Sequence, residues 1–324
     1  MTAGTYIKRH TKPSGEVTLM VNTAERYDPT RTTALRNKYA REMGKRFREL
    51  RGEIYRAIVQ QDVFGLRNNQ MGEPVVIHAQ RGQFAFTRTQ DKVAAFMEWL
   101  KTRQERGILE IVPGQQIGTA IDNSWQNLYL QDSYKRGVIR SRYELSKAGY
   151  PVQSLEQSGG IDAVLGGPTH VDRMGVVYTR AFNQLQGITD QMDMQISNVL
   201  AQGLADGDHP RLLARKINAT IKGGGADLGI TDTLGRFIPA ERRAKMLART
   251  EVIRAHHMAN VQEMENWAVE NVKVKVEWRT AGHNVCEICQ ALEGREFTLA
   301  EIRTMIPRHP HCRCMALPVD YSET

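Results

Sequence analysis

The stretch THVDRMGVVYTRAFNQLQGITDQMDMQISNVLAQGLA, residues 169–205, decides the fold class of this chain. Residues 169–172 resemble a capping box, and apolar side chains then recur at helical spacing. This apolar stripe consists of Ala181, Leu185, Ile188, Met192, Ile196, Val199 and Leu204. The sequence DGDHP at 206–210 ends the pattern. A long amphipathic helix is therefore predicted, and with it a mainly α (α+β) fold.

The rest of the chain contains further helical patterns and few strand patterns. Helices are predicted over 33–59, 89–106, 119–148, 211–222 and 239–270. The first has an apolar stripe made of Leu35, Tyr39, Met43, Phe47, Leu50, Ile54 and Ile58. The second has Thr89 as its predicted N-cap and Gly107 as its stop. Strands are predicted at 74–79 and 83–87, as a hairpin, and at 272–278, where VKVKVEW alternates strictly.

These patterns predict a helical body with long amphipathic helices and a small C-terminal α/β lobe, which a cluster of four cysteines at 286–314 is expected to staple with zinc. Residues 1–30 are interpreted as a basic, mobile arm, and residues 31–151 as an N-terminal helical region with the small hairpin. Residues 152–168 are rich in Gly and Ser and are interpreted as a linker. Residues 169–324 form the last predicted domain, which includes a zinc knuckle at 278–319.

Composition and charge exclude some classes of protein. With 41% hydrophobic and 25% charged residues among 324, the chain is not disordered throughout. No run approaches the roughly 18 apolar residues of a membrane-spanning helix, and residues 1–12 do not resemble a secretory signal. Of the net charge of +8, residues 1–60 contribute +7, with 13 basic and 6 acidic residues. This local excess indicates a polyanionic partner, above all nucleic acid.

The basic residues predicted to contact DNA phosphates are Lys8, Arg9, Lys12, Lys45 and Arg46. The first three lie in the arm and the last two in the helix predicted over 33–59. The alternative for the helix is that its charges form the solvated face of a packed element.

All four cysteines lie within the last 39 residues, in CEIC at 286–289 and HPHCRC at 309–314. A C-x-x-C turn presents two thiolates to one ion, and a second pair about 20 residues later completes a tetrahedral site. Zn²⁺ is the predicted cofactor, in a structural role, because thiolate and imidazole ligands favour it. The predicted ligands are Cys286, Cys289, His309 and Cys312, with Cys314 as the alternative and His311 as the least favoured donor.

Two other interpretations of the cysteines remain open, namely disulfides and metal-free thiols, the latter buried or redox-active. Four protein ligands would leave no position for an activated water, so the predicted zinc site is not catalytic. The sequence has no H-x-E element before a P-C-x-x-C, no H-E-x-x-H, no Walker A and no G-x-S-x-G. His256 and His257 point in different directions on a helix and are interpreted as ordinary histidines.

The run ARTE at 248–251, Trp278, the Cys286/Cys289 turn, LEG at 292–294 and HPHCRC at 309–314 occur in an order typical of one family. Over residues 170–319 the chain resembles the phage head-morphogenesis family, whose minor head proteins are also called MuF-like. Trp278 is expected to anchor the core beside the cysteines. Arg249 and Glu251 are expected to be an ion pair or cap partners, without a catalytic role.

This resemblance implies a virion structural protein, a minor capsid protein acting in head morphogenesis, with DNA ejection as a further expected role. Its expected partners are the portal protein or the inner capsid surface, and genomic DNA through phosphates, with no membrane-spanning segment. Its expected location is the phage head interior or portal vertex, and the host cytoplasm during assembly. The protein is not expected to be an enzyme. The alternative is a zinc-containing nuclease or toxin-like enzyme with a catalytic His309 or His311.

Overall fold

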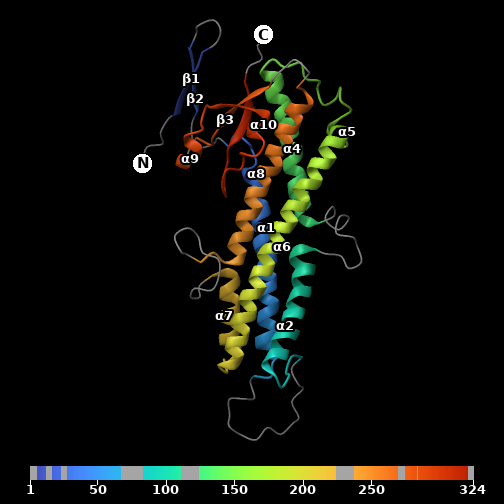
Figure 1. The fold of residues 1–324 in the computed structure, drawn as a ribbon, viewed down its shortest axis with the longest axis vertical. Helices are drawn as coiled ribbons and strands as arrows, with labels where there is room; N and C mark the ends of the chain where they lie inside the picture. Colours follow the sequence, from blue (N-terminus) through green and yellow to red (C-terminus); the bar gives the residue numbers. More distant parts are fainter. Residues whose placement is uncertain are drawn as a thin grey trace. The chain divides into compact units, whose positions relative to one another are not determined.

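The fold is described from a computed structural model over residues 28–66, 83–110, 124–223, 237–268, 274–282 and 284–319. The backbone of residues 6–11 and 17–22 is described as well. The main helices are α1 (Thr33–Tyr55), α2 (Thr89–Gln104), α4 (Trp125–Lys147), α6 (Pro168–Ala205), α7 (Pro210–Lys222) and α8 (Ala240–Asn266) (Figure 1). The short helices are α5 (Ile161–Leu165), α9 (Glu287–Gln290) and α10 (Leu299–Ile302), with π-helical turns η1 (Arg56–Gln60) and η3 (Glu105–Leu109).

In the part of the chain that the structure describes, five strands form two small antiparallel sheets. The strands β1 (Tyr6–Thr11) and β2 (Val17–Asn22) pair in a hairpin that the sequence analysis did not predict. The strands β3 (Lys275–Arg279), β4 (Glu296–Thr298) and β5 (Met315–Pro318) form a sheet in the order β4-β3-β5. The predicted mainly α fold with a small mixed C-terminal element is therefore confirmed. No helix in the described ranges is long and apolar enough to cross a membrane.

The chain divides into two compact units, each made of segments distant in sequence. Unit 1 comprises Met1–Lys38, Leu128–Tyr178 and Arg249–Thr324. Unit 2 comprises Tyr39–Asn127 and Thr179–Ala248. The helices α1, α4, α6 and α8 contribute residues to both units.

The core of unit 2 is formed by the apolar faces of its helices. From Tyr39 onward, each residue of the stripe predicted for 33–59 is buried, because spacings of three and four keep these side chains on one face. In α6 the stripe residues Leu185, Met192 and Ile196 are fully buried. Two members of that stripe, Ile188 and Leu204, are only partly buried.

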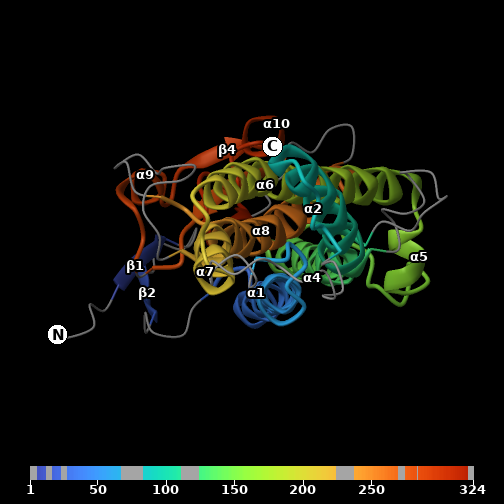
Figure 2. The same cartoon turned by 90° about the horizontal axis from the view of Figure 1, so that it is seen from below.

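Unit 1 depends on a close contact between α4 and α8, which lie beside each other in Figures 1 and 2. The Ser133 hydroxyl donates to the Val252 carbonyl at 2.6 Å, and the Ser141 hydroxyl donates to the Asn260 carbonyl at 3.1 Å. Between them, a Cβ on Gly137 would lie 2.4 Å from the His256 carbonyl oxygen. Small residues at every fourth position of α4 therefore let the two backbones approach closely.

The strand predicted at 83–87 is wrong. Phe84 is instead buried in irregular chain, where its ring packs 6.1 Å from that of Phe64 and 6.0 Å from that of Phe96. Packing among these rings stabilises that conformation without a ladder of backbone hydrogen bonds. The other predicted strand of the hairpin, 74–79, lies outside the described residues.

Several predicted helix ends were also wrong. Arg88, and not Thr89, is the N-cap residue of α2. Gly107 does not end the helical segment, because the π-helical turn η3 continues to Leu109 and buries Ile108 and Leu109. The stretch 152–168 includes the short helix α5, and α6 begins at its last residue. Residues 224–236 and the start of the strand predicted at 272–278 lie outside the described residues.

We predict that Gly137→Ala destabilises unit 1 by about 1–3 kcal/mol, because the new methyl group overlaps the His256 carbonyl and forces the helices apart. Gly175→Ala is the matched control. Gly175 also lies in a helix, but a Cβ there meets nothing within 4 Å, so this change should stabilise by about 0.5–1 kcal/mol. Urea unfolding of both variants measures the difference. Equal effects of the two changes would contradict the close helix contact.

Candidate metal centre

The four cysteines meet at one end of the three-stranded sheet. Cys286 is the N-cap of α9, and its sulfur accepts from the Cys289 amide at 3.5 Å. This single helical turn brings the two thiols of the C-x-x-C sequence to the same side. The second pair, Cys312 and Cys314, lies later in the sequence, just before β5. All four are free thiols, so the structure contains no disulfide between them.

Five potential ligand atoms form two overlapping groups. Cys286, Cys289 and His309 form one trio, and Cys289, Cys312 and Cys314 form the other. Within each trio the ligand atoms lie within 4.8 Å of one another. In a tetrahedral zinc site, Zn–S bonds of about 2.3 Å place two sulfurs roughly 3.8 Å apart. The ligand atoms of either trio are therefore nearly close enough to bind one ion. The shared residue is Cys289, which is buried.

The imidazole of His309 is oriented toward the thiols of the first trio. Its Nε2 lies 3.1 Å from the sulfur of Cys286 and 3.1 Å from that of Cys289. Its other nitrogen, Nδ1, lies 2.7 Å from the Pro310 carbonyl oxygen, to which it can only donate. This hydrogen bond fixes the tautomer in which Nε2 carries the lone pair, as metal-ligating histidines require.

The thiols of the second trio differ in their proton affinity. Burial, together with the neighbouring Cys312, raises the pKa of Cys289 to about 12. A hydrogen bond from the Cys314 side chain lowers the pKa of Cys312 to about 5, and the same interaction raises the pKa of Cys314. The thiolate is the form of cysteine that ligates metals, so only a cation among the sulfurs would ionise all of them together.

The lobe is anchored to α8 by polar side chains as well as by its apolar core. His257 Nε2 donates to the Ile302 carbonyl at 2.9 Å, and Asn260 donates to the Ala316 carbonyl at 2.8 Å. The Thr250 hydroxyl accepts from the backbone amide of His311 at 3.4 Å. One helix therefore holds α10, β5 and the segment between His309 and Cys312.

Trp278 is the largest fully buried side chain of this lobe, which confirms its expected role in the core. Burial lowers the pKa of His256 to about 3 and that of His257 to about 4, so both are neutral, packed histidines as predicted. Glu251 does form an ion pair, but its partner is Arg254, at 3.2 Å.

A buried cluster of polar residues, which the sequence analysis missed, lies between α4, α6 and α8. Glu263 accepts from Arg142 at 2.6 Å and from the Trp267 indole at 2.7 Å. Its second oxygen lies 3.0 Å from His170 Nε2, and His170 Nδ1 lies 3.0 Å from the Tyr134 hydroxyl. Burial opposes ionisation, but the hydrogen bonds from His170 and Trp267 and the charge of Arg142 outweigh it, so the pKa of Glu263 is lowered.

The structure describes the surroundings of two of the predicted DNA-contacting residues, Lys45 and Arg46. Lys45 is an exposed residue of α1 near Glu49, at 3.9 Å. Arg46 lies 3.1 Å from Glu110, and its guanidinium stacks 4.1 Å from the Trp125 ring centroid. These contacts favour a packing role for Arg46. Lys8 and Arg9 belong to β1, and Lys12 lies outside the described residues.

Residues 194–317 match the model of the family described as Phage Mu protein F like protein. The matched region begins within α6 and ends within β5, so it includes α7, α8 and all five candidate ligands. This match confirms the resemblance in that region. No curated protein and no solved structure gives a significant match to the chain.

We predict that Glu263→Gln destabilises unit 1 by about 3 kcal/mol at neutral pH, because it leaves Arg142 buried without its countercharge. Glu265→Gln, two residues further along α8, is the control. Its partner Arg303 is partly exposed, so its loss should cost at most about 1 kcal/mol.

The pH dependence of this difference follows from the lowered pKa of Glu263. The stabilisation by ionised Glu263 is fully present above its pKa in the unfolded chain, near 4.5. It is lost as the pH falls through the lower pKa of the folded protein. The difference in free energy of unfolding between the parent chain and Glu263→Gln should therefore become smaller from neutral pH to about pH 3, as denaturant titrations at each pH would measure. A difference in free energy of unfolding that grows on acidification would refute the conclusion that Glu263 is ionised in the folded protein.

Proposed function

Because residues 194–317 are similar to phage Mu protein F, we propose that this chain is a minor head protein of a phage virion and acts in head morphogenesis. The observation that carries the proposal is the overlap between the matched region and the folded unit around the cysteines. The match includes the helix α8, the strands β3 to β5 and every candidate ligand. The similarity therefore covers the C-terminal lobe and the helix α8 that holds it.

The role we propose is structural. In unit 1 the side chain of Glu263 accepts from Arg142 and meets His170, which is the kind of contact that supports a structural role. We propose that the helical body binds the portal protein or the inner capsid surface, and that the chain resides in the phage head interior or at the portal vertex. Assembly would take place in the host cytoplasm, and a contribution to DNA ejection belongs to the same proposal.

We further propose that the cysteine cluster holds one structural Zn²⁺. The donor types fit, because the thiols of Cys286 and Cys289 lie within 4.8 Å of the oriented imidazole of His309, and Cys289 lies equally close to Cys312. The proposed ligands are Cys286, Cys289, His309 and Cys312, with Cys314 as the alternative ligand, including in a site made of all four cysteines. The ion would neutralise the buried sulfurs and tie α9 to the segment before β5.

The head assignment is tested by analysing purified particles of the phage that encodes this chain. We expect quantitative mass spectrometry to find the chain in heads, in far fewer copies than the major capsid protein. Disrupting its gene should reduce the yield of infectious particles while the major capsid protein is still made. Absence of the chain from purified heads would refute the proposal.

The metal assignment is tested with two histidines of one segment. We predict about one zinc per chain by elemental analysis, a loss of zinc in His309→Asn and full retention in His311→Asn. His311 has a positive φ of 64°, which asparagine tolerates, so the control removes an imidazole without straining the backbone. A zinc-free parent chain, or equal losses in both variants, would refute the assignment.

The same pair of variants tests the enzymatic alternative. Metal-dependent DNA cleavage by the parent chain that disappears in a folded His309→Asn variant would favour a nuclease over a head protein. We expect no such cleavage.

We also propose that the N-terminal basic residues contact DNA phosphates. The triple change Lys8→Gln, Arg9→Gln and Lys12→Gln should weaken binding of duplex DNA. It should lower the slope of log K against log salt concentration by up to about 3, because each phosphate contact contributes about 0.9. An unchanged slope would exclude these residues from the interface.

A further inference from the structure

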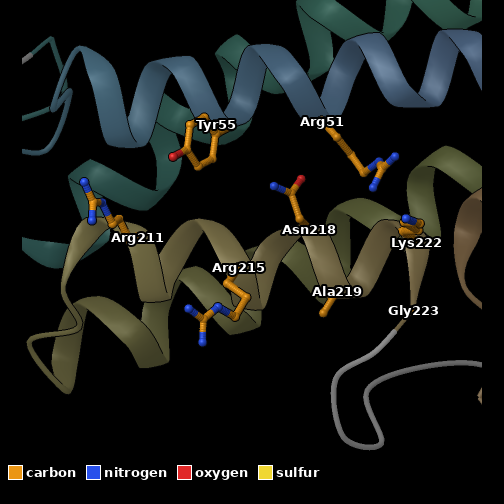
Figure 3. A pocket seen from close by; sticks show the side chains of 8 residues that line it. All are labelled: Arg51, Tyr55, Arg211, Arg215, Asn218, Ala219, Lys222 and Gly223. Atoms are coloured by element: carbon orange, nitrogen blue, oxygen red, sulfur yellow. The ribbon is translucent and has the colours of Figure 1, made fainter.

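A groove of about 420 Å³ lies between α1 and α7 within unit 2. Figure 3 shows Arg51 and Tyr55 extending from α1 toward α7, and Asn218 extending back from α7. Arg211 and Lys222 lie at opposite ends of this stretch of α7. The lining residues are Arg51, Tyr55, Arg211, Arg215, Asn218, Ala219, Lys222 and Gly223.

Among the lining residues that the structure describes, half are cations and none is acidic. Arg51 lies 3.8 Å from Glu241, so part of its charge is balanced. Among the residues that the structure describes, no carboxylate lies within 4.0 Å of Arg211, Arg215 or Lys222. Lys216 of the same helix behaves differently, because it pairs with Asp208 at 2.6 Å. The uncompensated positive charge of α7 is thus concentrated on the side that faces the groove.

The amphipathic character of α7 fixes this orientation. Its apolar residues Leu213, Ile217 and Ile221 are fully buried, so the helix cannot rotate without exposing them. Positions 211, 215, 218 and 222 then follow one another along the opposite face at spacings of three and four. Like charges four residues apart, as at Arg211 and Arg215, destabilise a helix. A bound polyanion would remove this repulsion.

Neutral hydrogen-bonding groups lie between the cations. Asn218 Oδ1 is buried and has no hydrogen-bond partner among the described residues. Because the two ends of a carboxamide are interchangeable by a flip, Asn218 can present a donor to a ligand oxygen at the same place. Tyr55, whose side chain is 42% exposed, adds a hydroxyl donor from α1.

From this arrangement we infer that the groove binds the phosphodiester backbone of nucleic acid. Arg211 and Lys222 are separated by about 16 Å along the helix axis, at 1.5 Å per residue. A row of cations of this length matches a polymer with regularly repeated negative charges, whereas one small phosphate ligand requires cations that converge on a point. The contacts are to phosphates, so recognition is independent of base sequence.

This inference uses residues other than those of the N-terminal contact proposed above, and it does not depend on the zinc site. It extends the proposed association with packaged DNA to a second surface. The head assignment and the groove can fail separately, because the first is tested by the content of purified particles and the second by binding of the purified chain to DNA.

The test compares two double variants of the full chain with equal loss of charge. Arg211→Gln/Arg215→Gln removes two groove cations, and Arg88→Gln/Arg106→Gln removes two exposed cations at the ends of α2 and η3. Glutamine keeps high helix propensity, so both proteins should fold, as circular dichroism checks. Binding of a duplex of arbitrary sequence is then measured over a range of salt concentrations.

We expect the groove variant to lower the slope of log K against log salt concentration by about 2, and the control variant to leave it unchanged. Equal slopes for the two variants would overturn the inference. Pyrophosphate serves as a second probe, and we expect it to compete only weakly with DNA. Loss of pyrophosphate binding in the groove variant, with DNA binding intact, would also overturn the inference, because the groove would then be a site for small phosphates.

Discussion

The close approach of α4 and α8 is the contact on which unit 1 depends. Ser133, Gly137 and Ser141 occupy one face of α4 at intervals of four, and the backbone of α8 lies against them. Close approach removes space for larger side chains but allows hydroxyl-to-carbonyl hydrogen bonds between the helices. It also fixes the rotation of α8 about its axis. The faces that α8 presents to the C-terminal lobe and to the buried polar cluster follow from that rotation.

Each of these faces has a separate task. Thr250, His257 and Asn260 bond backbone groups of the C-terminal lobe, so the helix positions the chain around the cysteines. Glu263 instead faces α4 and α6, where it accepts from Arg142 and meets His170. A buried carboxylate is costly unless its oxygens are fully hydrogen-bonded, and here they are. The polar cluster is therefore specific to one packing arrangement of the three helices.

The basic residues of the chain have different roles that composition alone does not distinguish. Arg46 binds Glu110 and stacks on Trp125, so its charge serves the packing of unit 2. Lys216 is neutralised by Asp208. Arg211, Arg215 and Lys222 face a groove without an acidic lining. The net charge of residues 1–60 pointed to the N-terminus, yet this row of cations lies in the part of the chain that is nearly neutral overall.

Local patterns in the sequence determined the helices of this protein and the identity of its metal-site candidates. Helical spacing is a property of neighbouring residues, so α1, α6 and α7 could be predicted within a few residues. The short spacings of the two cysteine segments likewise identified Cys286, Cys289, His309 and Cys312 as candidate ligands. A serine–glycine–serine repeat in α4 was also visible in the sequence and could have suggested a close helix contact. Only the tertiary structure decided that Glu263 meets His170, that Thr250 meets the loop at His311, and that α7 faces Arg51. These pairs are separated by tens of residues or more, and side-chain packing between helices, which no local periodicity encodes, brings them together.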